Sequence, residues 1–188
     1  MVRQDGLSRR RFLMMTAAAT TVAVMPARAF AGPRAGSPTE RVLSFFNTHT
    51  GERLTTAYCC GGEYQPEALQ AIDHILRDFR ANEVRAIDPA LLDLLHELGG
   101  ALRAGEPFHV ISGYRSPRTN AQLRSRGGAQ SGVASGSLHM IGKAIDIRMP
   151  GVQLHHLRQA AVALRRGGVG YYPVSDFVHV DTGRVRYW

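Results

Sequence analysis

The chain has 188 residues, of which 44% are hydrophobic and 20% are charged. This length and composition fit one globular domain with an extension and exclude a disordered chain. The formal net charge of +8 arises largely at the start, because residues 1–29 carry five arginines and one aspartate while the remainder holds 18 basic against 14 acidic residues. That modest excess suits an anionic partner. No nucleic-acid recognition motif accompanies it, so we expect no nucleic-acid role.

The N-terminal segment has the three parts of an export signal. Residues 8–13, S-R-R-R-F-L, form a twin-arginine motif, residues 13–25 are an apolar run, and residues 27–29, A-R-A, form a small-x-small cleavage site. The apolar run is shorter than the ~20 residues that span a bilayer. We therefore predict a twin-arginine signal peptide over residues 1–29, export to the periplasm, and no stable membrane span after cleavage. The alternative is an uncleaved anchor.

A linker and one folded domain are expected to follow. Residues 30–41 are rich in Ala, Gly, Pro and Ser without an apolar period, which indicates a flexible linker. The domain is predicted to cover residues 42–188. Its two cysteines, Cys59 and Cys60, are adjacent and cannot easily bridge one another, so we interpret them as structural residues at a strand end.

The sequence of the domain predicts alternating helices and strands. Helical apolar spacing and first-turn prolines, with Asp88 as a cap for the second helix, place the first two helices. The expected elements in chain order are one or two strands in 42–58, helices over 66–79 and 88–102, a strand at 108–111, a helix over 116–126, a strand at 144–147, a helix over 152–166 ended by Gly167-Gly168, and strands at 169–172 and 177–180. This order favours an α+β fold, a small mostly antiparallel sheet with helices packed on one face.

Polar residues that could carry chemistry gather in the last third of the chain. His139 follows a Gly/Ser loop at 127–137, and Asp146 lies on a predicted strand between Ile145 and Ile147. An ionised carboxylate in apolar surroundings is costly unless a positive charge compensates it. A divalent metal ion would supply that charge.

His179 follows the same logic on the last predicted strand, F-V-H-V-D, where polar residues share one face and valines the other. Two histidines and one aspartate are three protein ligands, which leave the fourth tetrahedral position open, as in catalytic zinc sites. Taken singly, each histidine is more often a hydrogen-bonded residue than a ligand, and Asp146 could cap a turn or pair with Arg148. The set of two histidines and two aspartates among buried strands is harder to explain in that way.

Three sequence segments resemble a known superfamily. The S-x-H-x2-G-x-A-x-D run of residues 137–146 and the S-G-Y-R segment of residues 112–115 resemble the LAS metallopeptidases. That superfamily contains the D-Ala-D-Ala dipeptidases and carboxypeptidases, phage endolysin peptidases and the hedgehog zinc domain. The run from Gly167 to Gly183 resembles its exported murein endopeptidase K branch. The likeness covers roughly residues 40–188 and implies an α+β fold with zinc on the sheet.

The resemblance also implies roles for individual residues. Zinc would be held by His139, Asp146 and His179, and Arg115 would stabilise the oxyanion of a tetrahedral intermediate. Two further residues of the matched segments, Tyr114 and Ser137, are expected to bind substrate. The implied activity is hydrolysis of peptide cross-links in peptidoglycan by a water molecule that the metal activates, by a protein that we expect to be a monomer.

The general base has two candidates. Asp176 stands three residues before the last histidine, where the dipeptidase branch has an acidic residue, usually the longer glutamate. Asp181 follows His179 by two residues and would share its strand face. It could act as base, or it could orient a ligand from behind. A carboxylate that serves as base must come within hydrogen-bond reach of the water it deprotonates.

Three classes of function stay open at this stage. The first is a zinc endopeptidase acting on peptidoglycan cross-links. The second is a D,D-carboxypeptidase or dipeptidase acting on peptidoglycan peptides. The third is a non-catalytic zinc-binding or cell-wall-binding domain, because a fold does not fix a function. The intact ligands, together with Arg115 and a nearby carboxylate, favour an enzyme.

Overall fold

The computed structural model describes residues 40–103, 105–127 and 133–188. The predicted signal peptide at residues 1–29 and most of the predicted linker lie outside these ranges. The last two linker residues belong to the fold, because strand β1 (Glu40–Asn47) already begins at Glu40. The side chain of Arg41 explains this start, since it pairs with Asp93 and donates to the Cys59 thiol.

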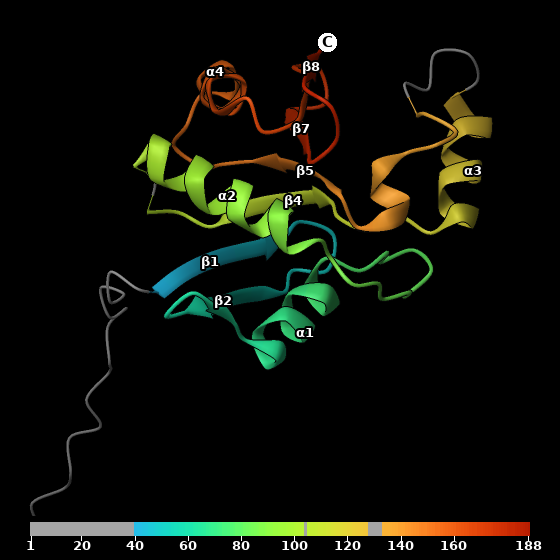
Figure 1. Cartoon of the computed structure of the whole chain (residues 1–188). Coiled ribbons are helices and arrows are strands. Elements are labelled where there is room, and N and C mark those ends of the chain that lie inside the picture. The colour runs from blue at the N-terminus through green and yellow to red at the C-terminus, as the bar shows by residue number, and fades with distance from the viewer. Residues whose placement is uncertain (1–39, 104, 128–132) are drawn as a thin grey trace, which may run out of the picture. The chain divides into compact units, whose positions relative to one another are not determined.

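The described chain builds one eight-stranded sheet, which confirms the predicted α+β class (Figure 1). The strand order is β3 (Glu63–Tyr64), β2 (Arg53–Cys60), β1, β4 (Phe108–Ser112), β5 (Ala144–Arg148), β7 (Phe177–Asp181), β6 (Gly168–Tyr172) and β8 (Arg186–Tyr187). Pairs β1–β4 and β6–β8 are parallel and the other pairs are antiparallel, so the sheet is mostly antiparallel, as expected. The edge strands β3 and β8 have two residues each, too few to show a period in the sequence.

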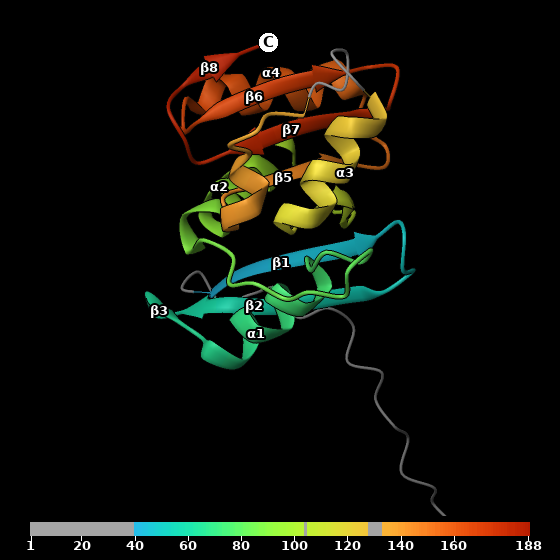
Figure 2. The same ribbon diagram turned by 90° about the vertical axis from the view of Figure 1, so that its right-hand side faces the viewer.

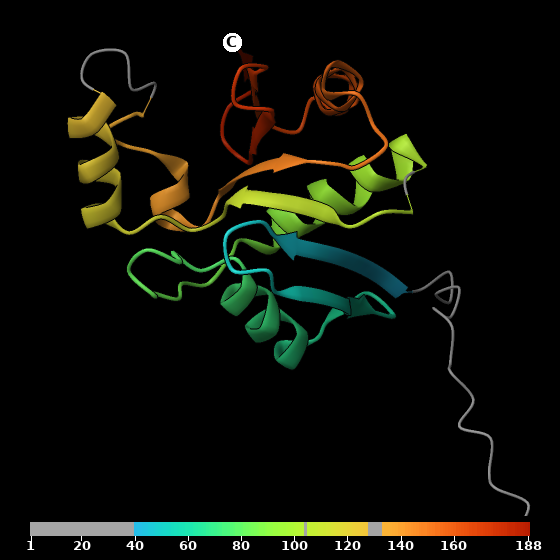
Figure 3. The ribbon, with the colours of Figure 1, turned by 180° about the vertical axis from the view of Figure 1, so that it is seen from behind.

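Four α-helices accompany the sheet: α1 (Pro66–Ile75), α2 (Pro89–Leu102), α3 (Pro117–Gly127) and α4 (Leu154–Leu164). Asp88 caps α2 by accepting a hydrogen bond from the Ala90 amide, as its position predicted. Helices α2 and α4 lie behind the strands in Figure 2, whereas α3 lies in front of them. Figure 3, which shows the molecule of Figure 1 from behind, has β4 and β5 in front of α2. None of the described helices is long and apolar enough to cross a bilayer.

Alternation along the central strands separates a core face from a site face. Val110, Ile147 and Val178 are cross-strand neighbours and are completely or almost completely buried. The neighbouring positions point to the other face, where Asp146 pairs in register with His179. The strand register therefore brings two predicted ligands together on the face away from α2 and α4.

One helix end differs from the prediction. Helix α4 ends at Leu164, and Arg165 adopts the left-handed conformation with φ 53°, so Gly167-Gly168 does not end it. Gly167 is needed for another reason. A Cβ there would lie 1.7 Å from the carbonyl oxygen of Asp181, so only glycine lets the two backbones approach this closely.

Candidate metal centre

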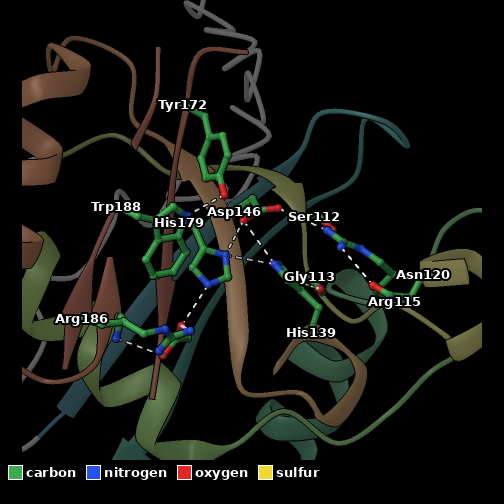
Figure 4. A network of polar contacts seen from close by, with 12 residues as sticks. Ser112, Gly113, Arg115, Asn120, His139, Asp146, Tyr172, His179, Arg186 and Trp188 are labelled. Atoms are coloured by element: carbon green, nitrogen blue, oxygen red, sulfur yellow. Dashed lines mark hydrogen bonds and ion pairs between the residues drawn. The ribbon is translucent and has the colours of Figure 1, made fainter. Parts of the chain in front are cut away.

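Three side chains from three elements converge on one point. His139 belongs to the short 3-10 helix η2 (Leu138–Ile141), Asp146 to β5 and His179 to β7. The Nε2 atom of His139 lies 3.2 Å from both Asp146 Oδ1 and His179 Nδ1, and the latter two atoms are 2.8 Å apart. All three side chains are buried, and Figure 4 shows them meeting.

The outer partners of the two histidines fix where their protons are. His139 Nδ1 lies 2.7 Å from the Gly113 carbonyl oxygen and His179 Nε2 lies 3.1 Å from Asp181 Oδ2. Both partners only accept hydrogen bonds, so each of these nitrogens carries the proton of a neutral ring. The opposite nitrogens then turn their lone pairs toward Asp146. Three acceptor atoms meet without a donor, an arrangement that fits a cation, and the described cluster could hold a metal ion.

Without a bound cation, positive charge on the facing histidines compensates the Asp146 carboxylate instead. Burial raises the pKa of Asp146, but the charges of and hydrogen bonds to His139 and His179 outweigh it and hold that pKa well below its usual range. Burial lowers the pKa of His179, but hydrogen bonds to Asp146 and Asp181 outweigh it and raise the pKa to about 8. A proton on His179 thus supplies the positive charge that a bound cation would otherwise supply.

Asp181 is held from all sides. Its Oδ1 accepts from the Gly168 and Gly183 amides at 3.0 and 2.8 Å, and Arg186 binds both carboxylate oxygens at 3.1 and 2.8 Å. Burial would raise the pKa of Asp181, but the hydrogen bonds from His179, Arg186 and the two amides lower it. The carboxylate is completely buried and faces the rear nitrogen of His179.

A cavity of about 160 Å³ opens beside the cluster. Arg115 reaches it from the segment after β4, with Nη2 3.5 Å from Asp146 Oδ2 and 3.3 Å from Ser112 Oγ. Burial lowers the pKa of Arg115, against the effect of Asp146. The lining consists of Arg115, Val133, Ala134, Gly136, Ser137, Leu138, His139, Asp146, Tyr172, Phe177, His179, Arg186 and Trp188.

The two predicted substrate-binding residues lie in different surroundings. Ser137 precedes η2 and lines the cavity. Tyr114 is 7% exposed, lies in the hydrophobic core and does not line the cavity. Its backbone amide donates to the Leu76 carbonyl, which holds the chain in place one residue before Arg115. The geometry gives Tyr114 a packing contact and leaves its substrate contact a prediction.

The predicted general bases also lie in different surroundings. Asp176 sits in the turn between β6 and β7 with φ 52°, and its side chain is 61% exposed. It pairs with Arg148 at 2.8 Å, so Arg148 is the partner of Asp176 and not of Asp146. Neither Asp176 nor Asp181 lines the cavity. Their catalytic roles stay predictions.

The cavity residues that were not singled out from the sequence include four near the C-terminal end: Tyr172, Phe177, Arg186 and Trp188. Trp188 reaches the site because β8 pairs with β6, where the Trp188 amide donates to the Val169 carbonyl and the Trp188 carbonyl accepts from the Tyr171 amide. A side chain on Gly170 would lie 2.7 Å from the indole. The aromatic residues of the G-V-G-Y-Y segment and at the chain end were the signals available in the sequence.

Comparisons with known proteins agree with the geometry. Residues 35–188 match the family Peptidase_M15_2, described as peptidoglycan L,D-endopeptidase MepK. The chain is 43% identical over 181 residues to peptidoglycan L,D-endopeptidase MepK of Escherichia coli (strain K12), which covers 96% of this chain and 97% of that protein. It is 40% identical over 183 residues to the probable peptidoglycan L,D-endopeptidase MepK of Haemophilus influenzae, covering 96% and 95%. The resemblance expected from the motifs is confirmed, and the chain belongs to the MepK family of peptidases, the murein endopeptidase K branch of the LAS superfamily.

Proposed function

We propose that this protein is a periplasmic zinc endopeptidase that hydrolyses peptide cross-links in peptidoglycan. One observation carries the proposal: two histidine lone pairs and a carboxylate converge without a donor at the wall of a cavity that Arg115 also lines. Relatives that match nearly the whole chain are named for endopeptidase activity on peptidoglycan. An exported enzyme would meet that substrate outside the cytoplasm.

The three converging residues are proposed to hold zinc through His139 Nε2, Asp146 Oδ1 and His179 Nδ1. Nitrogen and carboxylate ligands with one open position suit a catalytic zinc ion, which when bound polarises a carbonyl group and lowers the pKa of water toward ~7. Arg115 is proposed to stabilise the negative charge that develops on the substrate oxygen. Its burial strengthens that effect, because a preorganised donor acts more strongly away from water.

For Asp181 we favour the orienting role over that of the base. Its oxygens are occupied by Arg186, Gly168, Gly183 and His179, which leaves it suited to hold the His179 ring and its tautomer. Asp176 as the base stays a prediction, which requires the β6–β7 turn to bring its carboxylate to the cavity. The signal peptide at 1–29, the twin-arginine route, one peptidase domain that starts at Glu40 instead of residue 42, and a monomeric state complete the proposal.

Digestion of purified cross-linked peptidoglycan tests the proposal. Wild-type protein with zinc, the His139→Ala variant and a His155→Ala control would be compared, with products resolved by chromatography and mass spectrometry. His155 is an exposed histidine on α4, so its removal should change nothing. We expect cross-linked dimers to disappear with a matching gain of monomers in wild type and in the control, and not in His139→Ala.

Other outcomes would redirect the assignment. Release of single D-alanine residues with the cross-links intact would contradict the endopeptidase and establish a carboxypeptidase. Bound zinc without any product would contradict the enzyme and favour a binding domain.

A further inference from the structure

The cavity holds a tyrosine hydroxyl whose orientation is set by the last residue of the chain. Tyr172 lies at the end of β6 and lines the same cavity as Arg115 and the three converging residues. The Trp188 indole nitrogen lies 2.8 Å from the Tyr172 hydroxyl oxygen. Figure 4 shows the Tyr172 ring with its hydroxyl end directed toward the cluster, on the side where Trp188 lies.

The direction of this hydrogen bond decides where the tyrosine proton can go. An indole N–H donates and cannot accept, so the Tyr172 oxygen is the acceptor and its own O–H proton must point elsewhere. Among the hydrogen bonds within residues 40–103, 105–127 and 133–188, the one from Trp188 is that of the Tyr172 hydroxyl, and it does not use this proton. A partly buried hydroxyl at a cavity wall is therefore left as an available donor.

The surroundings hold both rings in place. The Tyr172 ring stacks on Phe177 with centroids 4.6 Å apart. The Trp188 ring packs against His179 at 5.3 Å, and the Arg186 guanidinium lies 4.8 Å over it. The same Arg186 binds Asp181, the carboxylate that faces His179. Tyr172, Trp188 and Asp181 are therefore connected through direct contacts.

We propose that the Tyr172 hydroxyl donates a hydrogen bond to the carbonyl oxygen of the scissile peptide bond, alongside Arg115, and that Trp188 is the positioning residue that aims it. The inference rests on the proposed function, since it names a further group that touches the same substrate. A donor aimed at an oxygen where charge develops lowers the barrier more than it strengthens substrate binding. The role differs from that of Arg115 because the phenol adds a hydrogen bond without adding a charge.

Tyr172→Phe tests the donor, because it removes one oxygen and keeps the ring that stacks on Phe177. Tyr171→Phe is the matched control. Tyr171 precedes Tyr172 on the same strand, packs against the core and does not line the cavity. With a soluble cross-linked muropeptide as substrate, we expect kcat to fall about 10²-fold in Tyr172→Phe with KM nearly unchanged, and both constants to stay at wild-type values in Tyr171→Phe.

A double-mutant cycle tests the positioning role. Trp188→Phe should lower kcat severalfold in the wild-type background and not lower it further in Tyr172→Phe, because the hydroxyl that Trp188 aims is already gone. A merely structural tryptophan would lower kcat equally in both backgrounds and so overturn the positioning role.

A further readout needs neither metal nor substrate. Trp188 is the chain's one tryptophan, so the ¹⁵N-labelled protein gives a single indole N–H resonance. That resonance should shift in Tyr172→Phe and stay in place in Tyr171→Phe, and the dispersion of the backbone amide resonances in the same spectra verifies that both variants are folded. An unshifted indole resonance in Tyr172→Phe would contradict the bond between Trp188 and Tyr172.

The two proposals can fail separately. Wild-type protein that cleaves no muropeptide overturns the proposed function. Wild-type cleavage with an unchanged kcat in Tyr172→Phe overturns the role of the tyrosine alone.

Discussion

Two polar clusters, one toward each end of the sheet, are built on opposite principles. In the Asp93 cluster, formed by Arg41, Tyr58, Tyr64, Cys59 and Asp93, one carboxylate meets only donors. It accepts from the Tyr58 and Tyr64 hydroxyls at 2.9 and 2.8 Å and pairs with Arg41, which in turn donates to the Cys59 thiol at 2.8 Å. Burial and the hydrogen bond to Asp93 raise the pKa of Tyr58. The cluster is balanced and needs no further group.

The candidate metal centre, formed by His139, Asp146 and His179, lacks such a balance of donors and acceptors. His139 and His179 point lone pairs at the Asp146 carboxylate, because their N–H groups donate to Gly113 and Asp181 on the opposite side of each ring. Buried acceptors that face each other are costly unless a cation joins them. The comparison suggests a general criterion: a buried polar cluster that closes on itself stabilises the fold, whereas one that lacks a positive partner is a binding site.

The largest effect should come from removing the carboxylate of the unbalanced cluster. In Asp146→Asn the amide can donate to a histidine lone pair, so we expect a folded protein that no longer needs a cation. Cleavage of cross-linked peptidoglycan should fall to background. Added zinc should no longer raise Tm, whereas in wild type zinc at 100 times its Kd stabilises the fold by about 2.7 kcal/mol.

Differential scanning calorimetry with and without zinc checks this, together with zinc content by mass spectrometry. Asp93→Asn is the matched control, because it changes the carboxylate of the balanced cluster and should keep the zinc response. A zinc-dependent rise of Tm in Asp146→Asn equal to that of wild type would contradict the unbalanced cluster as the metal site.

The placement of Asp146 and His179 on one face was predictable from strand alternation, whereas His139 reaches them from the 3-10 helix η2 and not from a strand. Residue spacing places Asp146 and His179 on one face of their strands, and the register then pairs them. The position of Trp188 beside the aromatic cavity residues Tyr172 and Phe177 was not predictable. It depends on a two-residue strand, β8, pairing in parallel with β6, and no periodicity in the sequence marks such a strand.

The next effect concerns Asp181, the carboxylate behind the candidate metal centre. Asp181→Asn should weaken zinc binding about 10–100-fold, because the His179 ring loses the carboxylate that fixes its tautomer. Competition with a chromophoric chelator measures the affinity. At saturating zinc, kcat should recover most of its wild-type value. A large loss of kcat that persists at saturating zinc would contradict the orienting role and assign Asp181 as the general base.

The hydrogen-bond partners of Asp181 show why the sequence alone could not decide between a general base and an orienting group. The spacing of two residues placed Asp181 near His179, as the structure has it. Its other partners are Gly168 of β6, Gly183 in the turn between β7 and β8, and Arg186 of β8. Only the packed structure reveals that the carboxylate is fully occupied, and this occupancy separates an orienting group from a base.

A smaller effect is expected in the balanced cluster. Asp93→Asn keeps one acceptor oxygen but loses the charge that Arg41 and the two tyrosines share, so we expect the free energy of unfolding to fall by about 2 kcal/mol. Urea denaturation measures the loss. Zinc affinity and kcat per folded molecule should stay at wild-type values, and a change in either would contradict the separation of the two clusters.

The smallest effect should come from a third carboxylate, which is balanced like Asp93 but supports the site. Asp78 is 2% exposed and accepts from the backbone amides of Ser116 and Arg80 at 2.9 and 3.0 Å, so it holds the chain beside Arg115. Burial raises its pKa, but the hydrogen bonds from Thr119, Ser116 and Arg80 lower it below the ordinary value of 3.8. The stabilisation is therefore fully present above pH 3.8 and is lost as the pH falls through the lower folded value. Urea midpoints between pH 3 and pH 7 should decline at the acid end in wild type and decline less in Asp78→Asn, because the amide cannot titrate; parallel curves would show that Asp78 does not contribute.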